Sequence, residues 1–289
     1  MAGLSYNVPR VLRSLSKIDP YHMMLGSKGP RDALASLPKT FIDPPHTKDV
    51  VILYSKMTRV ADSQVRRMII QRWNMRLRNV PGSREVIAEN EYVVHDEKSF
   101  RGRWNEVFGN DRPLHVEIGM GKGSFLLEMA RLHPEINFLG IEKYSSVLLR
   151  AIEKHEEAPE LTNLKFIRMD AEEIEEVFAP GEIAYIYLNF SDPWPKARHA
   201  KHRLTSDRFL RRYEKLLAAD GGVTFKTDNV DLFDFSVESA EECGWEQVAI
   251  SRDLHKSPYA EGNVMTEYER KFAGLGNKIC MMQIRPHRT

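Results

Sequence analysis

The spacing of apolar residues from about Leu114 to the C-terminus alternates between two periods. Short apolar runs, which predict strands, are followed by segments with one apolar face, which predict amphipathic helices. The expected strands are 114–118, 137–141, 164–168, 183–189, 223–226, 246–251 and 278–284. The expected helices are 124–132, a segment through 148–152, 171–178, 209–217 and 232–243. This alternation predicts an α/β fold, with a seven-stranded, mostly parallel sheet and helices on both faces. Asp220-Gly221-Gly222 predicts a turn, and an irregular stretch before the last strand predicts a closing antiparallel pair.

The first 74 residues have a different character. Prolines at positions 30, 38, 44 and 45 interrupt any long periodic element, and only 61–77 is expected to form a continuous helix. Residues 1–80 contain 14 Lys and Arg, 5 Asp and no Glu, a net charge of +9, whereas the remaining 209 residues carry −8. We therefore expect a basic, flexible extension over 1–74 and a second domain over 75–289. The extension is interpreted as an RNA-binding arm, a targeting segment or, the interpretation we favour, a consequence of start-site choice.

The cysteine count and the hydrophobic runs limit the class of protein. Cys243 and Cys280 are too few for a disulfide framework, and no Cys/His spacing resembles a zinc site. The longest apolar runs, such as 50–54, are far shorter than a membrane span, and no signal peptide is expected because the N-terminus lacks a continuous apolar stretch. The sequence therefore predicts a cytoplasmic protein that binds neither a membrane nor a metal.

A glycine-rich turn follows the first predicted strand. Gly119, Gly121 and Gly123 allow the backbone to turn tightly and to approach a ligand. A G-x-G-x-G run lacks the third glycine of the dinucleotide pattern G-x-G-x-x-G, which argues against a dinucleotide. Glu117 lies two residues before the first glycine, where its charge repels a pyrophosphate but suits the ammonium and sulfonium groups of S-adenosylmethionine.

Three further acidic residues follow the next strands. Glu142 ends the second strand, where it suits ribose hydroxyls; Asp170 ends the third, near the expected adenine amino group; Asp192 follows the fourth. Carboxyl ends of parallel strands line one crevice, so all four carboxylates are expected in a single cofactor pocket. The alternative is that they are helix N-caps or surface residues, and Asp170 in particular precedes a helix.

The segment NFSDPWPK, residues 189–196, closes the fourth strand. Prolines on both sides of Trp194 predict a stiff, exposed loop whose acid and aromatic ring suit a planar base; a structural turn is the alternative. A basic run follows, in which phosphate contacts are expected from Arg198, His199, Lys201 and Arg203. The helix after it extends this basic face through Arg208, Arg211, Arg212 and Lys215. A solvated charge run is the alternative interpretation.

With EIG at 117–119, GIE at 140–142, KTDN at 226–229 and TEYE at 266–269, this loop closely resembles the bacterial tRNA (guanine-N7)-methyltransferase family. The match runs from about Met75 to the C-terminus, and the family usually lacks the extension. The resemblance implies a Rossmann-like class I fold that uses S-adenosylmethionine to methylate a guanine in the variable loop of tRNA. It also implies a monomer or homodimer without an obligate protein partner. By the same resemblance, the cofactor contacts are Glu117, Glu142, Asp170 and Asp192, with Gly119 and Gly121 in the turn. Asp192 matches the family's proposed catalytic residue, and the substrate contacts are Lys196, Asp228, Thr266 and Glu269.

The chemistry of guanine N7 is consistent with this interpretation. N7 already presents a lone pair, so it needs no general base, and alignment with the methyl–sulfur bond supplies most of the rate. Asp192 is expected to orient the base or the cofactor's ammonium and to stabilise the cationic purine. The alternatives are a methyltransferase of the same fold with another substrate, a non-catalytic RNA-binding protein and, disfavoured by the glycine spacing, an NAD-dependent oxidoreductase.

Overall fold

The structure, a computed structural model, describes residue 80 and residues 82–287 of the 289-residue chain. The expected domain boundary at residue 74 and the expected helix at 61–77 lie outside the described residues. Within the described part, every helix is too short or too polar to cross a lipid bilayer.

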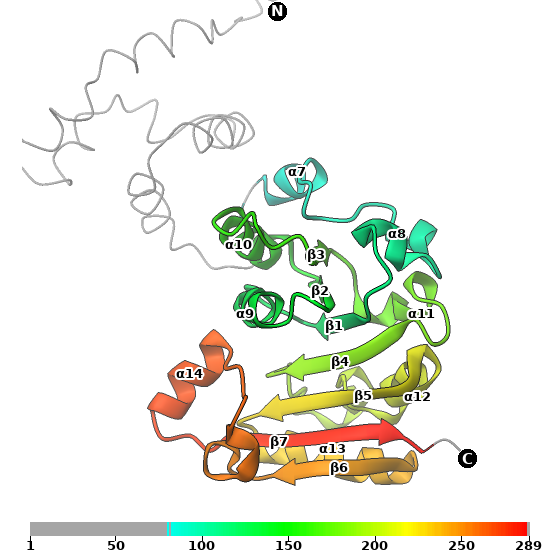
Figure 1. Cartoon of the computed structure of the whole chain (residues 1–289). Coiled ribbons are helices and arrows are strands. Elements are labelled where there is room, and N and C mark those ends of the chain that lie inside the picture. The colour runs from blue at the N-terminus through cyan, green and yellow to red at the C-terminus, as the bar shows by residue number, and fades with distance from the viewer. Residues whose placement is uncertain (1–79, 81, 288–289) are drawn as a thin grey trace, which may run out of the picture. The chain divides into compact units, whose positions relative to one another are not determined.

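The centre of the described fold is one sheet of seven strands in the order β3-β2-β1-β4-β5-β7-β6. The strands are β1 Leu114–Ile118, β2 Asn137–Ile141, β3 Leu164–Ile167, β4 Ile183–Asn189, β5 Leu217–Thr227, β6 Trp245–Ser251 and β7 Cys280–Pro286. β1 to β5 pair in parallel, and β7 is antiparallel to both of its neighbours (Figure 1). The mostly parallel sheet and the closing antiparallel pair are therefore confirmed.

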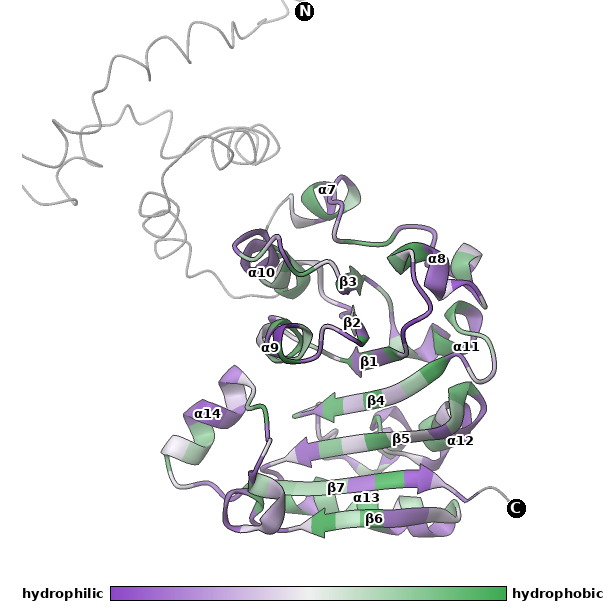
Figure 2. Cartoon of the chain, viewed as in Figure 1, coloured by the Kyte–Doolittle hydropathy of each residue, from purple (hydrophilic) through white to green (hydrophobic). Residues whose placement is uncertain are grey.

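Helices cover both faces of the sheet, as predicted. One apolar cluster joins the sheet to α7 (Ser83–Ala88), α9 (Ser124–Leu132) and α10 (Ser145–Glu156). A second cluster, on the opposite face, joins it to α11 (Ile174–Val177), α12 (Asp207–Leu216) and α13 (Val230–Glu242). Figure 2 shows that α9 and α10 carry both hydrophobic and hydrophilic residues, as helices on a sheet require.

Three sequence predictions of local structure were wrong in detail. The expected turn at 220–222 lies inside β5, whose pairing with β4 is irregular between Ile183 and Tyr185, so a bulge replaces the turn. The helix expected at 171–178 is a 3₁₀ turn, η2 (Ala171–Glu173), followed by the short α11. The stretch before the last strand is ordered as η4 (Leu254–Lys256), η5 (Pro258–Ala260) and α14 (Glu267–Gly274).

Residues 83–108 form α7, η1 (Glu97–Phe100) and α8 (Trp104–Phe108), for which the hydrophobic pattern predicted no element. These short elements depend on tertiary contacts. The Glu182 carboxylate accepts the backbone N–H groups of Gly102 at 2.9 Å, Trp104 at 3.1 Å and Ala179 at 2.8 Å. Because Trp104 is also buried, at 2% exposure, the segment is held at the start of β4 by a carboxylate and an aromatic ring.

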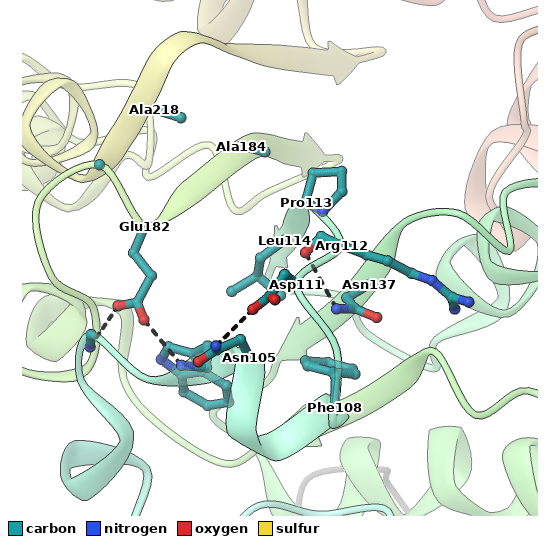
Figure 3. A pocket seen from close by; sticks show the side chains of 13 residues that line it. Asn105, Phe108, Asp111, Arg112, Pro113, Leu114, Asn137, Glu182, Ala184 and Ala218 are labelled. Carbon is teal, nitrogen blue, oxygen red and sulfur yellow. Dashed lines mark hydrogen bonds between the residues drawn. The ribbon is translucent and has the colours of Figure 1, made fainter.

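A cavity of about 410 Å³ lies beside this segment, at the amino ends of the strands (Figure 3). Most of its polar groups bind one another: Asn105 donates to Asp111 over 2.8 Å, and Glu182 takes the N–H groups named above. Ligands of open α/β sheets bind at the carboxyl ends of the strands, which is the opposite edge. We therefore interpret this cavity as part of the packing of α8 on the sheet.

Candidate active site

The turn after β1 is built on three glycines with left-handed backbone. φ is 74° at Gly119, 60° at Gly121 and 71° at Gly123, a region that residues with side chains rarely adopt. A Cβ atom added to Gly119 or Gly121 would meet no described atom within 4 Å, whereas one added to Gly123 would lie 2.8 Å from the Ala151 Cβ. The first two glycines therefore leave open space at the strand ends, and the third lets α9 pack closely against α10.

Glu117 and Asn189 form a buried polar pair at the carboxyl ends of β1 and β4. Asn189 Nδ2 donates to Glu117 Oε1 over 2.8 Å, and the two residues are 7% and 2% exposed, respectively. Burial raises the pKa of Glu117 from 4.5 to about 8, although the Asn189 hydrogen bond and the Lys226 charge oppose the rise. The carboxyl group is therefore mostly protonated at neutral pH, and a cation beside it would favour the ionised form.

Glu142, directly after β2, ties the glycine turn to the start of α10. Its Oε2 accepts the Gly121 N–H at 3.1 Å and its Oε1 accepts the Tyr144 N–H at 2.8 Å. Burial raises the pKa of Glu142, the backbone hydrogen bonds oppose this, and the charge of Asp192 raises it further. Glu142 and Asp192 are therefore close enough to interact, as the prediction of a shared crevice requires.

Asp170 follows β3 and forms the helix cap that the sequence left open as an alternative. Its Oδ1 accepts the Glu172 N–H at 3.2 Å at the start of η2, and its Oδ2 accepts a hydrogen bond from Lys143 at 2.6 Å. Partial burial alone would raise the pKa of Asp170, but the Lys143 and Glu172 bonds outweigh it and hold the pKa below its usual value. A cofactor contact by this ionised carboxylate stays a prediction.

The carboxyl edge of β1, β2 and β4 fits a ligand that carries a cationic group. Glu117 Oε2 is buried and has no hydrogen-bond partner in the described part of the chain. The open space at Gly119 and Gly121 lies next to it along the chain, and Glu142 adds a second acidic group. Among residues 80 and 82–287, no group of three or more His, Cys, Asp or Glu residues could hold a metal ion.

The loop after β4 has a strained backbone. Phe190 and Trp194 have φ values of 54° and 42°, and only one other described non-glycine residue has a positive φ. Such conformations cost on the order of 1 kcal/mol each and persist where the surroundings hold them. Arg203 supplies part of that support, because it donates to the carbonyls of Pro193 at 2.9 Å and Trp194 at 3.2 Å. The result is a loop with a held backbone that exposes the Asp192 side chain.

Cationic and aromatic side chains follow on η3 (Ala197–His202). The rings of His199 and His202 lie 5.7 Å and 5.2 Å from the ring of Trp194, which is 37% exposed. The predicted cations that are exposed here are Lys196, Arg198 and Lys201. Arg203 differs from them, because two of its donor groups hold the loop. RNA binding by these side chains stays a prediction.

The next helix, α12, adds less free positive charge than the sequence suggested. Arg208 and Arg212 form ion pairs with Glu172 at 2.6 Å and 3.1 Å, and Lys215 pairs with Glu175 at 3.0 Å. These arginines and the lysine join α12 to the η2–α11 segment. The exposed cations that directly follow the Asp192 loop are therefore Lys196, Arg198 and Lys201.

Helix α14 lies near the carboxyl end of β5 (Figure 1). One buried carboxylate, that of Glu269, joins the segment from η4 to α14 to Lys226 of β5. Glu269 is fully buried; Lys226 Nζ donates to it at 2.8 Å, Asn263 Nδ2 donates at 2.7 Å, and His255 Nε2 lies at 2.9 Å. Thr266 caps α14 by accepting the Glu269 N–H at 2.9 Å. In this arrangement Thr266 and Glu269 hold the chain in place, and their predicted contact with substrate is untested.

Asp228, the remaining predicted substrate contact, lies just after β5 and is half-buried. It accepts hydrogen bonds from Asn277 at 3.2 Å and from the Tyr268 hydroxyl at 3.4 Å. The Tyr268 ring in turn lies 4.9 Å from the ring of Phe190. The structure thus brings Asp228 to the same edge as the β4 loop.

Sequence reasoning did not select two buried residues, Asn189 and Lys226, although both lie inside motifs that it quoted. Burial lowers the pKa of Lys226, and Glu269 and Glu117 oppose that change, so the ammonium group is held between two acids. The sequence did contain a signal for them. Each is a polar residue near the end of an apolar strand, and the same criterion selected Glu117 and Glu142. Strands β4 and β5 pair Asn189 with Lys226 directly.

The chain is similar in sequence to known methyltransferases. Residues 111–282 match a sequence model of a family described as putative methyltransferase. The tRNA (guanine-N(7)-)-methyltransferase of Lachnoclostridium phytofermentans is 62% identical over 205 residues, 71% of this chain and 95% of that protein. The enzyme of the same name from Geobacillus thermodenitrificans is 52% identical over 206 residues, 71% and 94% of the two chains.

A solved structure of an antibiotic-related methyltransferase has a TM-score of 0.50 and 17% identity, and covers 68% of this chain and 96% of its own. It supports the fold, a Rossmann-like class I methyltransferase fold, which the strand order and the antiparallel β7 also indicate. The sequence identities are high and span nearly the whole length of the relatives. The chain therefore belongs to the tRNA (guanine-N(7)-)-methyltransferase family.

Proposed function

We propose that this protein transfers the methyl group of S-adenosylmethionine to N7 of a guanine in the variable loop of tRNA. The observation that carries the proposal is the juxtaposition of two environments at one sheet edge. Two buried acids, Glu117 and Glu142, suit a cationic cofactor, and the exposed loop of Asp192 leads into the cationic η3. Family membership supports the same reaction.

S-Adenosylmethionine, when bound, supplies an electrophilic methyl group on sulfur. Glu117 would hold its ammonium, and Glu142 and Asp170 would hold its nucleoside, each from the end of a different strand. The chain's own contribution is alignment, because guanine N7 carries a lone pair and needs no proton removed. The position of Asp192 on the held loop, near Glu142, supports a role in stabilising the positive charge that the purine acquires.

The direct test is transfer of labelled methyl from S-adenosylmethionine to unmodified tRNA, with the product mapped by the chain cleavage that N7-methylguanosine permits. We expect one cleavage in the variable loop. Asp192→Ala should reduce the rate about 100-fold or more, since one electrostatic stabiliser is typically worth that much. Asp220→Ala is the matched control, because Asp220 is an exposed acid in the amino-terminal part of β5. Cofactor binding without transfer to any tRNA would indicate another substrate or a non-catalytic RNA-binding protein.

The cations of η3 are proposed to contact tRNA phosphates. Binding should then weaken with salt, and Lys201→Ala should reduce the slope of log Kd against log salt by about 1, the effect of one lost phosphate contact. Lys165→Ala is a suitable control, since its amine donates to the Glu91 carbonyl at the β3 edge of the sheet. Equal slopes for wild type and Lys201→Ala would remove Lys201 from the interface.

A further inference from the structure

When Glu117 is ionised, two buried oxygens at the ends of β1 and β4 lack hydrogen-bond donors in the described part of the chain. They are Glu117 Oε2 and Asn189 Oδ1; the other polar atom of each side chain, Glu117 Oε1 or Asn189 Nδ2, already takes part in the hydrogen bond between the two residues. Leaving a buried acceptor without a donor costs about 1–3 kcal/mol, so such atoms in a folded protein call for an explanation. Because both of these oxygens belong to the hydrogen-bonded pair Glu117–Asn189, they indicate a binding position for a ligand group with several hydrogen-bond donors.

The nearest buried cation cannot supply these donors. Lys226 is paired with Asn189 in the sheet register, but all three of its N–H groups have acceptors. They go to Asn263 Oδ1 at 3.0 Å, the Val264 carbonyl at 2.9 Å and Glu269 Oε2 at 2.8 Å. An ammonium has only three donors, so Lys226 has none left for Asn189 or Glu117.

We propose that Asn189 is a cofactor-binding residue: its amide N–H fixes the Glu117 carboxyl group, and its carbonyl oxygen joins Glu117 Oε2 in accepting hydrogen bonds from the ammonium group of S-adenosylmethionine. This inference rests on the proposed function, because it assigns a second acceptor to the cofactor of that site. The pair also explains why an amide, rather than a second carboxylate, ends β4. An acid at 189 would repel Glu117, whereas an amide donates to Glu117 and still offers a neutral acceptor.

The test compares two ligands by isothermal titration calorimetry: S-adenosylhomocysteine, which carries the ammonium, and 5′-methylthioadenosine, which lacks the whole amino-acid part. Asn189→Ala should weaken S-adenosylhomocysteine about 10- to 100-fold, the effect of a lost hydrogen bond to a charged group, and leave 5′-methylthioadenosine within about twofold. Asn189→Leu, which keeps the γ-branched shape of asparagine without its polar atoms, replaces the alanine variant if that variant does not fold. Asn163→Ala is the matched control: Asn163 is buried and bonds three carbonyls beside β3, so its loss should lower the melting temperature without separating the two ligands.

The pH dependence of binding provides a second measurement that a packing defect would not change. The Asn189 hydrogen bond lowers the pKa of Glu117, so Asn189→Ala should move the pH at which S-adenosylhomocysteine affinity rises to a higher value. Lys226 on β5 and Glu142 after β2 also act on Glu117, in opposite directions, and both are unchanged in the variant.

The binding experiments have three distinguishable outcomes. Selective loss of S-adenosylhomocysteine affinity with a shifted pH midpoint supports the assignment. Equal weakening of both ligands, or an unchanged affinity for S-adenosylhomocysteine, refutes it while the proposed function stands. A wild-type protein that binds neither ligand would instead overturn the proposed function itself.

Discussion

Replacement of Glu117 by glutamine should stabilise the ligand-free protein, and increasingly so as the pH rises. Burial raises the pKa of Glu117 from 4.5 to about 8 in the folded state. An acid with a raised folded pKa contributes stability that is complete below pH 4.5 and is lost as the pH rises toward 8. In this range the unfolded chain ionises Glu117 freely, whereas the folded protein either keeps the proton or buries a charge.

The magnitude follows from the same two pKa values. At about 1.4 kcal/mol per pH unit, the difference in unfolding free energy attributable to Glu117 between pH 5 and pH 9 is on the order of 4 kcal/mol. Since about 1 kcal/mol shifts the melting temperature of a domain of this size by 2–4 °C, Glu117→Gln should melt roughly 10 °C above wild type at pH 9. At pH 5 the two proteins should differ by only about 2–3 °C on the same conversion.

The assay is thermal unfolding followed by far-ultraviolet circular dichroism, without ligand, at pH values from 5 to 9. The quantity of interest is the difference between variant and wild type, because titrations elsewhere in the chain cancel in it. Glu128→Gln is the matched control: Glu128 is exposed on α9, so its charge is already in water. A difference between Glu117→Gln and wild type that stays constant from pH 5 to 9 would refute the reasoning. The same variant should lose cofactor affinity, which separates stability from function at one residue.

Three further predictions concern the elements that hold the site. Glu269→Ala leaves the Lys226 ammonium buried without its main partner and should lower the unfolding free energy, measured with denaturant, by about 3–5 kcal/mol. Replacing both residues by methionine should recover part of that loss. If the effects of the two single substitutions simply added up in the double variant, the pairing would be contradicted. Arg203→Ala removes two hydrogen bonds to loop carbonyls and should lower kcat for methyl transfer about 10-fold or more with little change in S-adenosylhomocysteine affinity, so unchanged kcat would argue against a positioning role. Gly123→Ala, which meets a Cβ at 2.8 Å, should lower the melting temperature by more than Gly121→Ala, which meets no described atom; a larger loss from Gly121→Ala would contradict the packing argument. Gly121→Ala should mainly weaken cofactor binding, and unchanged cofactor affinity would place the ligand elsewhere.

The sheet could be predicted from the sequence because its strands are continuous apolar runs between turn signals. The bounds of β1, β2 and β4 agree with the predicted ranges at every residue. The elements between residues 83 and 108 could not be predicted, since they are short and depend on distant partners such as Glu182. A local pattern carries no signal for a contact of that kind.

The residues of the candidate site likewise fall into those that the sequence could predict and those that it could not. Glu117 and Glu142 were found because they interrupt or end apolar strands at positions where ligands bind. The role of Glu269 as a buried partner of Lys226 was not found, because the two residues are 43 positions apart and only the fold brings them together. Arg203 was assigned to RNA from its place in a basic run, whereas its hydrogen bonds to the loop depend on the conformation of η3.

Several unfavourable features of the described chain lie together at one edge of the sheet. A carboxyl group with a raised pKa, two unpartnered buried oxygens and two residues with positive φ all lie at or just beyond the ends of β1 and β4. The apolar clusters on both faces hold these strand ends in place, so the edge retains its shape although it would be more stable with other residues. A bound ammonium would give Glu117 and Asn189 the donors they lack and would lower the pKa of Glu117. The edge is thus destabilised in a way that a cationic ligand specifically relieves, and this connects the folding energetics of the domain to cofactor recognition.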